Sequence, residues 1–82
     1  MFTTSRYASE KSRKLALELA KEKKELFICR GKHTIAALVE IARKKGEKRI
    51  SIVEEEKGMP KKIAHITVFE LGDWKWSGED EL

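Results

Sequence analysis

The stretch from Phe27 to Thr34 holds the residues best suited to binding a charged ligand. An apolar run ends there at Arg30, and Thr34 can cap a helix that follows. A strand that leads into a helix N-terminus leaves free backbone N–H groups and the positive end of a helix dipole. Such a corner binds anions readily, and Arg30 and Lys32 add positive charge to it. The stretch therefore predicts a phosphate-binding corner around Arg30, Gly31 and Lys32.

Residue types that serve in catalysis or metal binding are present but form no recognisable constellation. Cys29 and His33 lie four positions apart, but His65 is the only other histidine, so no second pair completes a metal site. We interpret Cys29 as a buried small hydrophobic residue. Adjacent carboxylates in the run 54–56 point to alternating sides of an extended segment, so we expect them to be solvated or paired with lysines. The sequence predicts no enzymatic activity, no metal and no cofactor.

Length and composition indicate one small domain. The 82 residues are 40% hydrophobic and 39% charged, which excludes a disordered chain. No apolar run approaches the roughly 18 residues of a membrane span, and no signal peptide is apparent. A single cysteine fits an intracellular, cytoplasmic setting. The lack of Asn and Gln beside abundant Lys and Glu is typical of thermophilic proteins.

Charge is distributed unevenly along the chain. Residues 1–49 hold 14 Lys and Arg against 6 Glu, a net charge of +8, whereas residues 50–82 hold 4 Lys against 8 Asp and Glu, a net charge of −4. A basic first half favours a phosphate-bearing partner such as nucleic acid. Solvated helix faces in a Lys- and Glu-rich protein are the alternative.

Periodicity predicts a framework of helices and strands. Helices are expected over residues 9–24, with Ser9 as N-cap, and over residues 34–45, ended by Gly46 in the left-handed conformation. Strands are expected over residues 2–4, 26–29 (buried on both faces), 49–53 and 63–71, with a turn over 54–60. The result is a single small α/β domain over residues 1–71, in the order β-α-β-α-β-β with a mixed sheet, followed by an acidic tail over residues 72–82.

This order predicts where the polar residues meet. Carboxyl ends of parallel strands and N-termini of the crossover helices gather at one edge of a sheet, where ligands bind. Hydroxyl groups and arginines at a strand end can hold phosphate oxygens, or they can satisfy loop backbone. The residues predicted to bind RNA at this edge, or to extend it through the last turn, are Thr4, Ser5, Arg6, Arg30, Gly31, Lys32, Lys57, Lys61 and Lys62.

Four motifs follow one another at spacings that resemble the Brix domain, a family of ribosome-biogenesis factors of archaea and eukaryotes. They are Thr3-Thr4-Ser5-Arg6, then Arg13, then Arg30-Gly31, then the run Glu55-Glu56-Lys57-Gly58-Met59-Pro60. The resemblance covers residues 2 to about 71 and matches only the first of the two similar halves of the family fold. Each half of that fold looks like the anticodon-binding domain of class II aminoacyl-tRNA synthetases.

The resemblance implies a role in pre-ribosomal RNA processing or subunit assembly, with direct contact to ribosomal RNA and no catalysis. It implies ribosome-assembly proteins as further partners, and a homodimer would replace the missing half. Structural alternatives stay open for single residues. In this alternative, Gly31 is needed only to form a tight turn and Arg30 pairs with a local carboxylate. We expect Gly58 and Pro60 to be turn residues.

Trp74 and Trp76 lie in acidic surroundings that repel RNA, so we expect them to pack on the domain or to anchor a protein interface. Two other functions remain open. One is an Alba-like protein that binds DNA and RNA with little sequence preference. The other is a homodimeric protein-interaction module that binds no nucleic acid.

Overall fold

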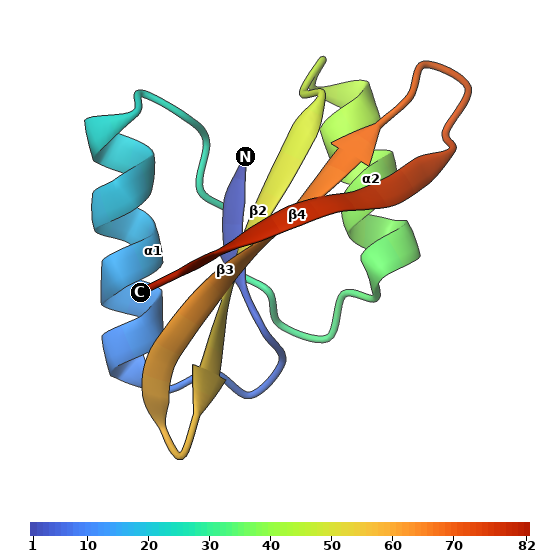
Figure 1. The fold of residues 1–82 in the computed structure, drawn as a ribbon. Helices are drawn as coiled ribbons and strands as arrows, with labels where there is room; N and C mark the ends of the chain where they lie inside the picture. The colour runs from blue at the N-terminus through green and yellow to red at the C-terminus, as the bar shows by residue number, and fades with distance from the viewer.

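The computed structural model describes residues 1–82 as one four-stranded sheet with two helices (Figure 1). Strand β1 pairs in parallel with β2, and β2, β3 and β4 follow in antiparallel order. The small α/β fold with a mixed sheet is therefore confirmed. The elements in chain order are β1 (Phe2–Thr4), α1 (Glu10–Glu22), α2 (Ile35–Lys44), β2 (Arg49–Glu56), β3 (Met59–Val68) and β4 (Trp74–Glu81).

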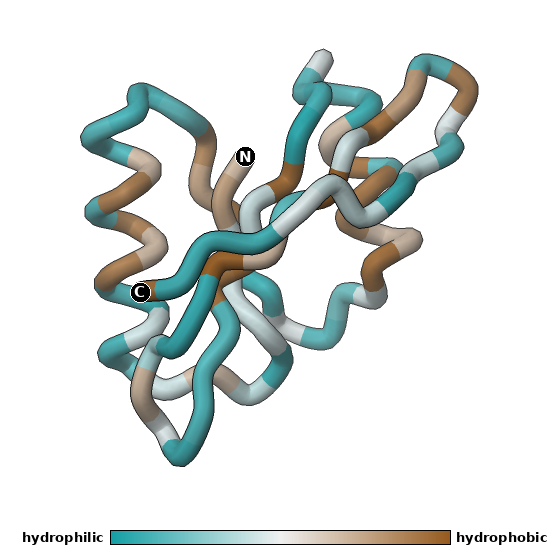
Figure 2. The backbone as a smooth tube through the Cα atoms, viewed as in Figure 1, coloured by the Kyte–Doolittle hydropathy of each residue, from teal (hydrophilic) through white to brown (hydrophobic).

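The two helices cover opposite faces of the sheet (Figure 1). Alternate residues of β2 point to opposite faces, so Ile50 and Ile52 join one apolar cluster and Val53 joins another. The first cluster includes Leu38 of α2, and the second includes Ala16 of α1. Hydrophobic stretches recur along both helices and in the middle of the strands, whereas the β2–β3 turn is hydrophilic (Figure 2). No helix in the chain has the length and apolar character needed to cross a membrane.

Both helices begin as the sequence predicts and α2 ends as predicted, whereas α1 ends at Glu22, two residues before the predicted end. The Ser9 hydroxyl accepts from the backbone N–H of Ser12, and the Thr34 hydroxyl accepts from that of Ala37 at 3.1 Å. Gly46 follows the second helix with φ +73°, a left-handed conformation that glycine adopts at little cost. Local capping chemistry therefore sets these boundaries.

The predicted buried strand over residues 26–29 is wrong. Only Phe27 bridges to Phe2 of β1, with Ile28 N–H donating to the Phe2 carbonyl at 2.9 Å, and Cys29 is exposed rather than buried. Phe27 packs against the α1-side cluster and Ile28 against the α2-side cluster. The apolar run therefore contributes one side chain to the apolar cluster on each face of the sheet, and it does so from the sheet edge without forming a full strand.

The predicted turn over residues 54–60 is too long. Strand β2 continues to Glu56 and β3 begins at Met59, which leaves only Lys57 and Gly58 as the turn. Both have positive φ, 54° and 77°, as two-residue hairpin turns that match the strand twist require. The strand expected over residues 63–71 ends at Val68. Glycine adopts this conformation readily, whereas the residue type of Lys57 does not predict a left-handed conformation.

The segment expected to be an acidic tail contributes β4 to the sheet. Residues Trp74–Glu81 pair antiparallel with β3 along their whole length. Two of the acidic side chains meet basic partners on β3, Glu79 with Lys62 at 3.0 Å and Asp80 with His65 at 2.8 Å. Cross-strand charge pairs of this kind let an acidic, fully exposed sequence form an edge strand.

Candidate nucleic-acid interface

A cavity of about 270 Å³ lies where β1 ends, beside the turn that precedes α2. Five residues predicted to bind RNA line it, and these are Thr4, Ser5, Arg30, Gly31 and Lys32. Arg13 of α1 adds a third positive charge, and no acidic residue belongs to the lining. We call this site the basic cavity. The structure therefore forms the predicted corner from segments that lie 26 residues apart in the sequence.

Arg30 ties the two walls of the basic cavity together. Its Nη1 donates to the Thr4 carbonyl at 3.0 Å, and its Nε donates to the His33 carbonyl at 2.7 Å. Burial, and next the positive charge of Arg6, lower the pKa of Arg30. The partners are carbonyl groups rather than the carboxylate considered in the structural alternative, so the charge of Arg30 is not neutralised by an ion pair.

Gly31 is required for its conformation rather than for its small size. It has φ +51° in a turn that the His33 N–H closes onto the Arg30 carbonyl at 3.0 Å. A Cβ atom at Gly31 would meet no atom within 4 Å. The glycine therefore supplies a left-handed turn, which sets the direction in which Lys32 leaves the cavity wall.

Arg6 and Tyr7 form the outer rim of the same end of the sheet. The Arg6 guanidinium lies 5.5 Å from the centre of the Tyr7 ring. Tyr7 is 88% exposed and has φ +58°, an uncommon conformation for a residue with a side chain. Tyr7 and Arg13 also line the basic cavity, although neither is among the residues predicted to bind RNA. For Arg13 the available signal was its place among the Brix-like motifs.

The N-terminus of α1 is filled by a side chain of the protein. Glu55 accepts from the Ser9 N–H at 3.1 Å, from the Ser9 hydroxyl at 2.8 Å and from the Ser12 hydroxyl at 2.6 Å. These bonds, led by the one from Ser12, lower the pKa of Glu55. The expectation that Glu55 is solvated or paired with lysine is wrong. Because a carboxylate already occupies this helix end, α1 offers no free anion site.

The lysines of the β2–β3 hairpin do not join the basic cavity. Lys62 lies between Glu79 at 3.0 Å and Glu54 at 3.8 Å, and its pKa is raised mainly by the bond to Glu79. Lys57 and Lys61 are exposed and lie outside the cavity lining. Glu54 thus does pair with a lysine, as expected.

Trp74 and Trp76 stand together on β4. Their ring centres are 5.8 Å apart with the rings nearly perpendicular, and Trp76 is 53% exposed. Trp76 shares a hollow with the carboxylates of Glu54 and Glu79, which is not a phosphate-binding arrangement. No group of three or more His, Cys, Asp or Glu side chains in the chain is placed to hold a metal ion.

Two solved structures resemble this fold over nearly the whole chain. One is Mil, an archaeal Imp4-like protein, with 27% sequence identity and a TM-score of 0.75; the match covers 89% of this chain and 45% of that one. The other is a probable ribosomal biogenesis protein from Aeropyrum pernix K1, with 25% identity and a TM-score of 0.85; the match covers 95% of this chain and 44% of that one.

The chain thus spans less than half the length of either neighbour. No protein-family model matches the sequence, and no curated protein matches it. The resemblance to one half of the Brix fold, which the sequence indicates, is confirmed by the structural neighbours.

Proposed function

We propose that this chain is a non-catalytic, RNA-binding factor of ribosome biogenesis that acts in the cytoplasm on ribosomal RNA or its precursor. The two structural neighbours support the ribosome-biogenesis part of the proposal, since they are named as Imp4-like and as a probable ribosomal biogenesis protein. The basic cavity supports the RNA-binding part. Its role is to hold and position RNA during processing or subunit assembly.

The lining of the basic cavity supports the proposal most strongly, because it gathers three cationic side chains and three hydroxyl groups without a single carboxylate. Arg13, Arg30 and Lys32 supply the charge, and Thr4, Ser5 and Tyr7 supply the hydroxyls. Phosphate oxygens are the ligand that such a set fits best, because guanidinium groups bind them through paired N–H donors. Arg6 stands outside this cavity and extends the positive surface toward a longer strand of RNA.

The mechanism is positional. Arg30 is held by two carbonyl groups, so the cavity keeps its shape before RNA arrives and little side-chain freedom is lost on binding. Phosphate contacts fix the register of the RNA, whereas shape and unpaired bases supply specificity. Trp74 and Trp76 lie on β4, and we assign them to a protein interface rather than to RNA. A homodimer and a ribosome-assembly protein are both partners that such an interface can serve.

The experiment that tests the proposal is a salt series of binding to ribosomal RNA fragments and to duplex DNA of matched length. Wild type is compared with Lys32→Ala and with Lys44→Ala, a control that removes the same charge near the end of α2. We expect a preference for ribosomal RNA, and a salt slope for Lys32→Ala shallower by about 0.7, the value for one lost contact to a single strand. Equal binding to RNA and DNA would favour the Alba-like function, and the absence of binding at moderate salt would refute the RNA-binding proposal.

A further inference from the structure

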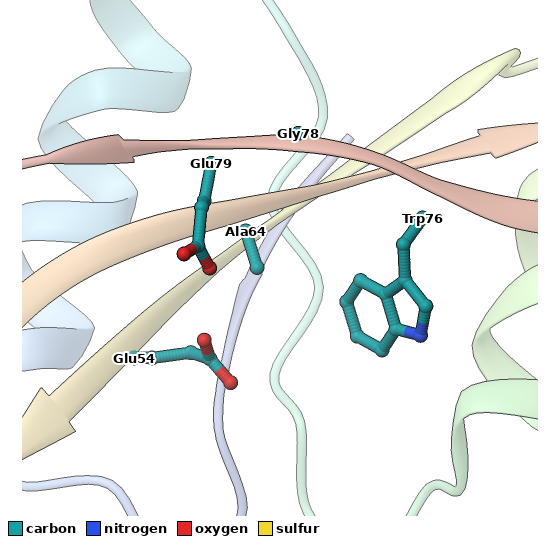
Figure 3. Close-up of a pocket in the computed structure, with 5 residues that line it drawn as sticks. All are labelled: Glu54, Ala64, Trp76, Gly78 and Glu79. Carbon is teal, nitrogen blue, oxygen red and sulfur yellow. The ribbon is translucent and has the colours of Figure 1, made fainter.

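A second hollow, of about 330 Å³, opens on the sheet face that carries α2 (Figure 3). It is lined by Glu54 of β2, Ala64 of β3, and Trp76, Gly78 and Glu79 of β4. Figure 3 shows the Trp76 ring and the two carboxyl groups on the same side of the strands, with Ala64 between them. We call this site the acidic hollow. It shares no lining residue with the basic cavity.

A β-bulge creates the acidic hollow. His65 is paired with Gly78, but the next residue, Ile66, is paired with Trp76, so Ser77 is an extra residue on β4. A shift of one residue moves a side chain to the other face of a sheet. The bulge therefore places Trp76 on the same face as Ile66 and Glu79, where the hollow lies. Bulges of this kind commonly re-aim a side chain beside a functional site.

The hollow has more negative than positive charge. Lys62 lies 3.0 Å from Glu79 and 3.8 Å from Glu54, so one ammonium group faces two carboxylates. Glu81 is a further carboxylate that raises the pKa of Lys62, after Glu79 and Glu54. A cationic group that enters the hollow therefore meets an excess of negative charge beside an indole ring. Trp is the aromatic side chain that attracts cations most strongly.

We infer that the acidic hollow binds an arginine side chain from an extended, basic segment of a partner protein. The carboxylates of Glu54 and Glu79 accept from the guanidinium, and the Trp76 ring covers it. Strand β4 is the last strand of the sheet, so its outer edge pairs with no strand of this chain. An extended segment can add to such an edge while its side chains enter hollows on the face.

The charge of the hollow selects against the other occupants. RNA is repelled by Glu54, Glu79 and Glu81, and an apolar segment would add no cation to two carboxylates that share the single ammonium group of Lys62. This site does not depend on the proposed RNA binding, because its residues are separate from those of the basic cavity. Failure of one proposal therefore leaves the other standing.

The test is calorimetric titration of the full chain with a short peptide of alternating Arg and Ser residues, and with the same peptide carrying citrulline, the neutral isostere of arginine. The Glu79→Gln variant removes one charge from the hollow. Asp80→Asn removes one charge from the next residue, whose side chain contacts His65. We expect Glu79→Gln to weaken binding about fivefold and Asp80→Asn to change it less than about twofold.

A second readout is the NMR signal of the Trp76 indole N–H, assigned with the Trp76→Leu variant. The arginine peptide should shift this signal in wild type and in Asp80→Asn, and the citrulline peptide should not. The inference is overturned by equal binding of the two peptides, or by equal losses in Glu79→Gln and Asp80→Asn. It is also overturned if the hollow proves to be occupied by a second copy of this chain, seen as self-association that Glu79→Gln abolishes and the peptide does not affect.

Discussion

The basic cavity and the acidic hollow are built in different ways from the same sheet. Loops that follow β1 and precede α2 supply the cavity, and they are fixed by hydrogen bonds from Arg30 to two carbonyl groups. Residues of three neighbouring strands supply the hollow, and the β4 bulge fixes their arrangement. Shape in the first site depends on one side chain, whereas shape in the second depends on backbone register.

The two sites meet at Glu54. This residue lines the acidic hollow, and its charge also acts on Arg30, whose pKa it raises slightly against the larger effects of burial and Arg6. A small domain can therefore present surfaces of opposite charge without merging them, provided that an internal cation, here Lys62, limits the field of the acidic side. The following predictions test whether the two sites act independently and what holds each in place.

The largest effect is expected from charge reversal at the basic end. Arg6→Glu combined with Lys32→Glu should weaken binding to a ribosomal RNA fragment about 100-fold, since contacts to phosphate are replaced by repulsion. The arginine peptide should bind as before. Filter binding and calorimetry measure the two affinities, and Lys44→Glu combined with Lys48→Glu is the charge-matched control. Equal losses in both double variants would mean that net charge alone, not the basic cavity, drives RNA binding.

The next effect is a loss of stability at Arg30. Arg30→Met keeps the aliphatic bulk but removes the donors to Thr4 and His33, and we expect a cost of about 1 kcal/mol because the group is partly exposed. Thermal denaturation should show a decrease of about 4–8 °C, as for other domains of this size. Glu79→Gln serves as the comparison and should lower the melting temperature by less, because its ion pair with Lys62 is largely exposed. An unchanged melting temperature for Arg30→Met would show that the cavity walls keep their arrangement without this side chain.

A loss of stability of similar size is expected at the bulge. Gly78 has φ +136°, which residues with a side chain rarely adopt, so Gly78→Ala should destabilise the chain by about 1 kcal/mol. The variant should also weaken binding of the arginine peptide and leave RNA binding unchanged, because Trp76 no longer lies beside Glu79. Gly46→Ala, at a left-handed glycine that follows α2, is the control for strain without a change in β4. If RNA binding fell as well, the two sites would not be structurally independent.

Glu55 should make stability depend on pH. Its pKa is lowered in the folded chain, so the folded state binds a proton less readily than the unfolded state. The stabilisation is therefore present above the ordinary pKa of a glutamate and is lost as the pH falls through the lowered value. Urea denaturation should show a lower midpoint for Glu55→Gln than for wild type near neutral pH, with the gap closing in acid. A gap that persists in acid would assign the effect to packing rather than charge.

The smallest effect tests the border between the sites. Glu54→Gln should weaken binding of the arginine peptide and strengthen RNA binding by about twofold. The reason is that Glu54 lines the acidic hollow and its charge also acts on Arg30. The same variant thus moves the two affinities in opposite directions. Titrations at low and high salt measure both, since screening should remove the effect on RNA. Changes of the same sign would contradict the shared border.

Local signals predicted much of this molecule. Ser9, Thr34 and Gly46 define the helices through caps that act within a few residues, and the strand-end rule brought Thr4, Ser5 and Arg30 together. The missed features depend on distant partners. Glu55 caps a helix whose N-cap residue, Ser9, lies 46 residues earlier, so its own neighbours gave no sign of this role.

Two further features were hidden by composition. The acidic sequence of β4 indicated a tail, because the lysine and histidine that contact its carboxylates lie on another strand. The apolar run that begins at Leu26 indicated a fully buried strand, whereas Phe27 and Ile28 serve opposite faces from the sheet edge. In both cases the residue types were interpreted correctly as charged or apolar, but their partners determined the structure.

The exposed edge of β4 also bears on how the protein behaves at high concentration. An unpaired strand edge is a template on which identical chains stack into fibrils. In a parallel, in-register stack, Glu79, Asp80 and Glu81 of each copy would lie directly against the same carboxylates of the next, which repel one another. The same acidic residues that favour a basic partner therefore protect the chain from fibril growth, and neutralising all three should make its solutions prone to amyloid.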